Sequence, residues 1–489
     1  TSLTTVACGG GSTTKPLDPS DSSGKKDASG SEVAKKAAAG FNTASDSFVA
    51  QDQAGTWSDA TCKQVAGQFQ TASSEQRSAT GKDLPEALYN AGLAYQRCGD
   101  DANAKSEFQK AADADKSFHR ARAQLALYKF KESGNLDATV AELDQIIKDA
   151  KFQNVEALVS VASLQMQRGG STAGAGCSND FACAQLNLQR ALAIDDSYMP
   201  AFNQLALYYL EQAKAESEGK TKGKKGGLAV SGAKKAKVNK QRLDLAALVA
   251  SQATKKNPNY APIHNTSGLI LVELENYNGA VQAFGRARAL NPKFFEAQMN
   301  YAAVNLSFRG YAEAEKAYRE AIKLRPNTYE AHLGLALALR GQIEGEKADA
   351  MLAEAQKELD EAKKIDSKRA ETYYNEAILG EEFKAKRAAD PVPGFRAASK
   401  QYEEFIAKAG GEAAFAEAVK RSKERIEEIK QTVDFIEETK KMDEQQKKDL
   451  EMMKAQEEAE KKAAADAAAT QPADPNAPAA PAAPAAPAQ

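Results

Sequence analysis

The sequence has few cysteine, histidine and aromatic residues. Its 489 residues include five cysteines, three histidines and one tryptophan, and aromatic residues make up 7% of the chain. No pair of Cys-x-x-Cys units and no His-Glu-x-x-His motif is present, which argues against a structural zinc site. Hydrophobic residues still make up 42%, so alanine must fill much of the interior. This composition favours closely packed helices over an aromatic-rich β-sandwich.

The sequence also lacks an excess of one charge and long apolar runs. The formal net charge is -2, so no overall field steers the chain to nucleic acid. No run of about 18 apolar residues occurs, and we predict no membrane-spanning helix. Charge is instead segregated into a basic insertion at 220–242 and a mixed-sign run at 412–465. The insertion has no aromatics for base stacking, so we expect a solvated loop, with anionic lipid or an acidic partner as the alternative.

What the sequence does contain is a period of 34 residues. A pattern of alanine, aromatic, alanine and proline recurs at this spacing, as Ala280, Phe284, Ala287 and Pro292 and then as Ala314, Tyr318, Ala321 and Pro326. A period of this length is typical of a repeated helix-turn-helix unit. Small residues let the two helices of a unit approach, and the aromatics fill the space between units. We therefore expect stacked helix pairs.

This pattern resembles the tetratricopeptide repeat (TPR) family, in which each repeat is a pair of antiparallel helices. The resemblance implies an all-α fold, a TPR superhelix or α-solenoid. We expect about eight pairs within 85–410, preceded by a degenerate pair at 32–80. One long charged helix at 412–465 would follow, either as a solvated single helix or as a coiled-coil partner. Residues 1–31 should be a disordered tether and 466–489 an extended Ala/Pro-rich tail.

The beginning of the chain resembles the end of a bacterial lipoprotein signal peptide. Val6 and Ala7 precede Cys8, and a Gly/Ser run follows it. The chain begins without Met, so we expect an upstream segment that carries the apolar part of the signal. The resemblance implies that Cys8 is acylated and held at a membrane. By the same resemblance, Gly9 implies sorting to the outer membrane, because an Asp at this position would retain a lipoprotein at the inner membrane. The alternative to acylation is a chance cysteine in a disordered leader.

The other four cysteines form two candidate pairs. Cys177 ends a short glycine-rich loop and Cys183 lies six residues further on, while Cys62 and Cys98 lie at the ends of neighbouring predicted helices. Two disulfides would imply an oxidising compartment. Four unbridged thiols are the alternative.

In the TPR family, the first helix of each pair lines a groove that binds peptides. Asparagine offers both a donor and an acceptor to an extended backbone, and aliphatic neighbours suit peptide or helix capture. The alternative is that these positions contact the chain's own C-terminal helix. The groove residues that the resemblance implies are Tyr89, Asn90, Asn203, Asn265, Leu269, Met299, Asn300 and Leu333.

No catalytic set of residues emerges from the repeats. His264 and His332 occupy the same repeat position and are expected to be packing groups. The repeats also take up nearly all of the folded length, which leaves no room for a catalytic domain. We therefore predict that the chain is not an enzyme and has no cofactor, metal, small-molecule substrate or nucleic-acid partner; its partners are other proteins.

The layout as a whole resembles the TPR lipoproteins of the myxobacterial adventurous-gliding motility machinery. The resemblance implies an envelope scaffold, lipid-anchored on the periplasmic face of the outer membrane. There it would dock partners within a complex that transmits force from an inner-membrane motor to the surface. The first alternative is a pilotin-like lipoprotein that assembles a secretin or polysaccharide-export pore. The second is an enzyme with a TPR regulatory region.

Overall fold

The computed structural model describes residues 32–54, 57–171, 174, 176–218 and 239–469. Within these residues the chain forms nineteen α-helices and no β-strand, which confirms the predicted all-α class. None of the described helices is both long enough and apolar enough to span a bilayer. Lipidation at Cys8, the tether at 1–31, most of the basic insertion and the tail beyond 469 were predicted for parts of the chain outside the described residues.

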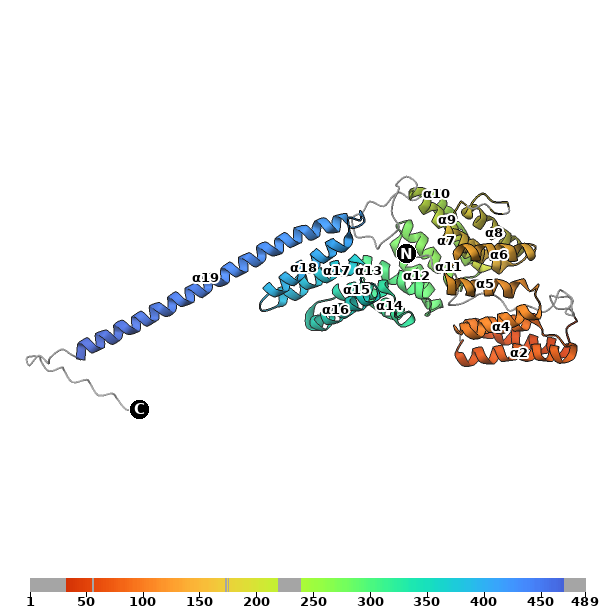
Figure 1. The fold of residues 1–489 in the computed structure, drawn as a ribbon, viewed down its shortest axis with the longest axis horizontal. Coiled ribbons are helices and arrows are strands. Elements are labelled where there is room, and N and C mark those ends of the chain that lie inside the picture. The colour runs from red at the N-terminus through yellow and green to blue at the C-terminus, as the bar shows by residue number, and fades with distance from the viewer. Residues whose placement is uncertain (1–31, 55–56, 172–173, 175, 219–238, 470–489) are drawn as a thin grey trace, which may run out of the picture. The chain divides into compact units, whose positions relative to one another are not determined.

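The chain divides into two compact units, Thr1–Ser367 and Lys368–Gln489. In the first unit, sixteen helices follow one another as eight hairpins, as the 34-residue period predicts (Figure 1). The hairpins are α1 (Lys35–Ala54) with α2 (Asp59–Thr80), α3 (Pro85–Arg97) with α4 (Asp101–Ala114), α5 (His119–Ser133) with α6 (Leu136–Asp149), α7 (Val155–Arg168) with α8 (Asp180–Ile194), α9 (Met199–Glu218) with α10 (Lys240–Lys256), α11 (Ala261–Glu273) with α12 (Tyr277–Leu290), α13 (Phe295–Ser307) with α14 (Tyr311–Leu324), and α15 (Tyr329–Arg340) with α16 (Ala348–Ile365).

Short polar side chains begin most of the second helices of these hairpins. The side chain of Asp100 accepts a hydrogen bond from the backbone N–H of Asn103, and Asn276 does the same for Gly279. Asn residues cap α6, α8 and α10 in the same way. Each such cap contributes about 1 kcal/mol to its helix. The turn inside a hairpin is therefore encoded locally, by one side chain.

A glycine facing an aromatic ring closes two of the hairpins. A Cβ atom on Gly92 would lie 2.6 Å from the Phe108 ring, and one on Gly268 would lie 2.5 Å from the Phe284 ring. Both rings are completely buried. Only glycine therefore lets the second helix bring its ring this close to the first helix.

The first helices of successive hairpins form a layer. Helix α9 contacts α11, α11 contacts α13, and α13 contacts α15, in addition to the contacts within each hairpin. A side chain on one first helix can therefore meet a side chain about one repeat away in sequence. This layer positions the candidate site.

The second unit contains the last predicted pair and the long helix. Helix α17 (Ala370–Ile378) continues through a π-helical turn (Leu379–Lys384) and a 3-10 turn (Ala385–Arg387) before α18 (Val392–Ala409). The long helix α19 runs from Ala416 to Ala469, compared with the predicted 412–465. Its Ile429 and Val433 pack with Phe395 and Tyr402 of α18 in one buried cluster.

A buried carboxylate ties α19 to this unit. Glu381, in the π-helical turn, accepts a hydrogen bond of 2.9 Å from the Tyr402 hydroxyl and one of 3.2 Å from Nε of Arg425. Arg425 also pairs with Glu382. Burial, together with the Glu381 carboxylate, raises the pKa of Tyr402 far above its usual value. Beyond these contacts, residues 441–467 of α19 are all exposed.

Candidate docking face

Six of the predicted groove residues lie on neighbouring first helices of the fourth to seventh repeats, counted from α3. We call the surface that they define the docking face. They come from α9, α11, α13 and α15, which lie side by side in the layer of first helices. The six residues are Asn203, Asn265, Leu269, Met299, Asn300 and Leu333.

The asparagines of the docking face bond to neighbouring helices. Nδ2 of Asn300 donates to Oδ1 of Asn265 over 2.9 Å, and the Thr266 hydroxyl donates to Oδ1 of Asn203 over 2.6 Å. These bonds link α13 to α11 and α11 to α9. An asparagine side chain has two N–H donors and two acceptor lone pairs, so one internal bond leaves capacity for a ligand. Asn203 and Asn300 are half-buried, whereas Asn265 is buried.

The apolar residues of the docking face differ in how far a partner can reach them. Leu269 and Met299 are half-buried and so present part of each side chain to solvent. Leu333 is 2% exposed and belongs to the interior. The accessible part of the face therefore combines Leu269 and Met299 with the amides of Asn203 and Asn300. The prediction that Leu333 lines an accessible groove is corrected, because the side chain is enclosed.

Tyr89 and Asn90 of the first repeat also require a correction. Both side chains are completely buried. The Tyr89 ring packs 5.3 Å from the Phe108 ring and 5.7 Å from the Phe118 ring, measured between centroids. Burial raises the pKa of Tyr89 well above its usual value. These residues hold the hairpins together and offer no surface to a ligand in this conformation.

One repeat position has a role that the sequence analysis missed. The side chains of His264, Gln298 and His332 each reach the carbonyl oxygen of the proline six residues earlier. The distances from Nε2 are 2.8 Å, 3.0 Å and 2.7 Å to Pro258, Pro292 and Pro326 respectively. The 34-residue spacing of both sets is the signal that could have revealed this contact. The two histidines are thus more than packing groups, because they hold the end of the preceding helix pair.

His332 makes a second contact that favours its charged form. Its Nδ1 lies 2.6 Å from Oε2 of Glu358 on α16, and both side chains are only 10% exposed. With oxygen atoms beside both ring nitrogens, the protonated ring can donate two hydrogen bonds. The hydrogen bond to Glu358, supported by the one to Pro326, raises the pKa of His332.

All four cysteines of the described residues are joined in disulfides. Cys62 of α2 is bonded to Cys98, which follows α3, and Cys177 is bonded to Cys183 at the start of α8. The second disulfide joins the end of the insertion between α7 and α8 to the first turn of α8. Arg168 holds Asp180 beside this loop, with Nε–Oδ2 and Nη2–Oδ1 distances of 2.8 Å and 2.6 Å. Burial alone would raise the pKa of Asp180, but the bonds from Arg168 and the Gly170 amide hold it below its usual value.

The described residues contain no group of three or more His, Cys, Asp or Glu side chains that could hold a metal ion.

Comparison with known proteins identifies the repeat. The tetratricopeptide repeat family matches residues 85–118, which are α3, α4 and the residues that follow α4. This segment is the first repeat that the sequence analysis predicts. Proteins built from such repeats generally bind other proteins through their extended surfaces. No curated protein sequence matches the chain.

Several solved structures are similar to parts of the chain. A thermophilic TPR protein of Thermus thermophilus is 22% identical over 45% of this chain and 99% of that chain, with a TM-score of 0.36. A tetratricopeptide repeat protein from Parabacteroides merdae is 15% identical over 63% of this chain and 99% of that chain, with a TM-score of 0.36. The pilF protein of Pseudomonas aeruginosa is 17% identical over 54% of this chain and 95% of that chain, with a TM-score of 0.38.

Proposed function

We propose that this chain is a non-catalytic scaffold, lipid-anchored at the periplasmic face of the outer membrane, that docks partner proteins of a gliding-motility complex. The observation that carries the docking role is the layer of first helices. On α9, α11 and α13 it presents half-buried aliphatic side chains next to amides with unused hydrogen-bonding capacity. Such a surface suits the apolar side of a partner helix or an extended segment.

The envelope location is supported by the cysteines. Disulfides form and persist in oxidising compartments and are rare where thiols are kept reduced. The four cysteines of the described residues are all paired. The fifth, Cys8, follows Val6 and Ala7 and carries the resemblance to a lipoprotein signal peptide described above. An acylated Cys8 would place the oxidised repeats in the periplasm.

The assignment to a motility complex rests on the resemblance of the layout described above. A lipidated start, a repeat array, a long charged helix and an Ala/Pro-rich tail suit a part that must reach between layers of the envelope. Helix α19 alone has 54 residues, or about 80 Å at 1.5 Å per residue.

Fractionation of cells tests the anchor. We expect the chain, expressed from its own gene, to be found in the outer-membrane fraction with acyl chains detected on Cys8 by mass spectrometry. Cys8→Ser should move at least nine-tenths of it to the soluble periplasmic fraction, because no other acylation site is predicted. Ser12→Ala is the matched control and should leave the distribution unchanged.

An affinity pull-down from the same envelopes tests the partner. Recovery of motility-complex subunits with wild type would support the scaffold. A multimeric export pore in their place would contradict it in favour of a pilotin-like role. In the fractionation experiment described above, a Cys8→Ser variant that stays in the outer-membrane fraction would contradict the lipid anchor.

A further inference from the structure

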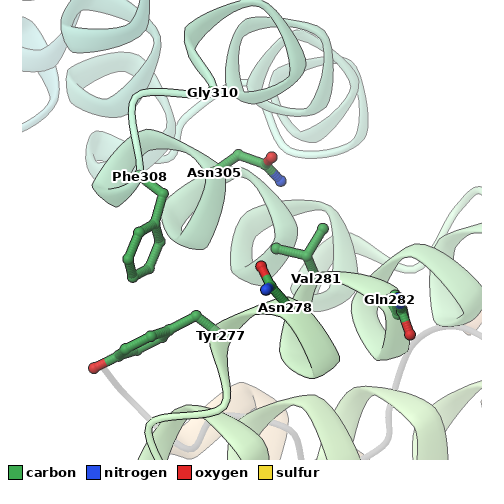
Figure 2. A pocket seen from close by; sticks show the side chains of 7 residues that line it. All are labelled: Tyr277, Asn278, Val281, Gln282, Asn305, Phe308 and Gly310. Carbon is green, nitrogen blue, oxygen red and sulfur yellow. The ribbon is translucent and has the colours of Figure 1, made fainter.

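An open notch of about 430 Å³ lies in the first unit and is lined by residues other than those of the docking face (Figure 2). The start of α12 forms one wall, and the end of α13 with its following turn forms the other. Tyr277 is the only ionisable side chain in the lining. The notch is lined chiefly by Tyr277, Asn278, Val281, Gln282, Asn305 and Phe308.

Two aromatic rings form the apolar part of the notch. The centroids of Tyr277 and Phe308 are 4.5 Å apart, and their planes are inclined by 45°. Phe308 is 56% exposed, whereas every other aromatic side chain in the described part of this unit is buried or half-buried. Covering this ring with a ligand would remove apolar surface from water. Val281, half-buried beside the rings, extends the same surface.

Amide groups beside the rings supply the polar part of the notch. Asn278 and Gln282 are exposed on α12. Neither side chain has a hydrogen-bond partner among the residues that the structure describes. Asn305, by contrast, donates its Nδ2 to the carbonyl of Tyr301 over 2.8 Å. Two exposed amides next to an aromatic pair can donate to the carbonyl oxygens of an extended peptide.

We propose that this notch binds the Ala/Pro-rich segment 471–489 of a second copy of this chain. The prolines of this segment recur at every third position, as Pro472, Pro475, Pro478, Pro481, Pro484 and Pro487. A polyproline II helix has three residues per turn, so these prolines would share one edge. Segments of this kind dock in aromatic-lined grooves, and their carbonyl oxygens accept hydrogen bonds. Asp474 is the only charged side chain of the segment, which matches the uncharged notch.

The exposed end of the long helix favours a second copy as the source of the occupant. Ion pairs of Glu437 with Arg396 and of Lys440 with Asp390 join α19 to α18 and to the residues just before it. Residues 441–467 are then exposed over about 40 Å of helix. The segment 471–489 therefore follows, in sequence, a long exposed stretch of helix that a second molecule can reach.

Binding of a labelled peptide to the full chain tests the proposal. We expect a fluorescent peptide of residues 471–489 to bind the chain saturably in an anisotropy titration. Phe308→Ala should weaken binding at least tenfold, because the exposed ring is lost. Leu248→Ala, which changes a residue 54% exposed on α10, is the matched control and should bind like wild type. A peptide of the same composition with irregularly spaced prolines should bind at least tenfold more weakly.

Self-association of the full chain tests the source of the segment. Sedimentation velocity should show a concentration-dependent dimer for wild type that Phe308→Ala loses. Phe308→Leu keeps apolar volume at this position but removes the ring. We expect this variant to lose the dimer as well, because the proposed contact is the packing of the aromatic ring against proline. Equal binding of the irregular peptide, unchanged binding to Phe308→Ala or a wild-type chain that stays monomeric would overturn the proposal.

Discussion

Replacing Gly268 by leucine should lower the free energy of opening the α11–α12 hairpin by about 3 kcal/mol, the upper end of the range for overpacked cores. A Cβ atom at this position would lie 2.5 Å from the Phe284 ring, and that ring is completely buried. The ring cannot leave without exposing apolar surface, so the helices must separate. Hydrogen exchange of the α11 and α12 amides measures the local free energy, which suits a repeat array better than one global transition.

Gly67 provides the matched control. It lies inside α2, and a Cβ atom there would meet nothing within 4 Å. Gly67→Ala should therefore stabilise its helix by about 0.5–1 kcal/mol, because alanine restricts the unfolded backbone. In the Gly268→Leu background, Phe284→Ala should restore part of the loss, since the two changes compete for one space. Equal effects of substitutions at Gly67 and Gly268 would contradict the close packing described here.

Removing the partner of His332 should have an effect of similar size. At pH 6, Glu358→Ala should lower the free energy of opening the α15–α16 hairpin by about 3 kcal/mol, as is typical when one partner of a buried ion pair is lost. The imidazolium would then be enclosed without its carboxylate, since both side chains are only 10% exposed. Hydrogen exchange of the α15 and α16 amides measures this loss.

The same pair predicts a pH dependence with a definite sign. The pKa of His332 is raised in the folded chain above its ordinary value of 6.5. Its stabilising contribution is therefore fully present below pH 6.5 and is lost as the pH rises through the folded pKa. Burial, followed by the charge of Arg122, lowers the pKa of His119, so His119 contributes with the opposite sign. Because the two histidines act in opposite directions, the contribution of His332 must be measured as the difference in unfolding free energy between wild type and a variant that lacks only this histidine.

His332→Gln is that variant. The preceding repeat has Gln298 at this position, where it donates to the Pro292 carbonyl over 3.0 Å. Glutamine should therefore keep the bond to Pro326 and remove only the titrating charge. Wild type should be more stable than His332→Gln at pH 6, and the difference should shrink as the pH is raised. A difference that is constant between pH 6 and pH 9 would show that His332 is not charged in the folded chain.

The repeat period predicts the helix pairs because it records contacts that are local in sequence. The aromatic that closes a hairpin lies 16 residues after its glycine, as in Gly268 and Phe284, so both ends of the contact fall within one period. The residues that close the turns, such as Asn276, are likewise visible in a single copy. The interruption of α17 by a π-helical turn carries no such local signal.

The candidate site was less predictable because burial depends on neighbouring hairpins. Tyr89 occupies a groove position in the repeat, yet rings from α4 and the following turn enclose it. Asn265 and Asn300 look like two independent ligand-binding amides, but they bond to each other across 35 residues. Which face of a first helix is accessible is decided by packing between repeats, which the period alone does not describe.

Site-specific cross-linking at Met299 tests the docking face most directly. A photoreactive amino acid at this half-buried position of α13 should cross-link the full chain to a partner protein in living cells. The same group at Leu248, which is 54% exposed on a second helix, is the matched control and should give at least tenfold less of that product. Equal cross-linking from both positions, or cross-linking from Leu248 alone, would contradict the docking face.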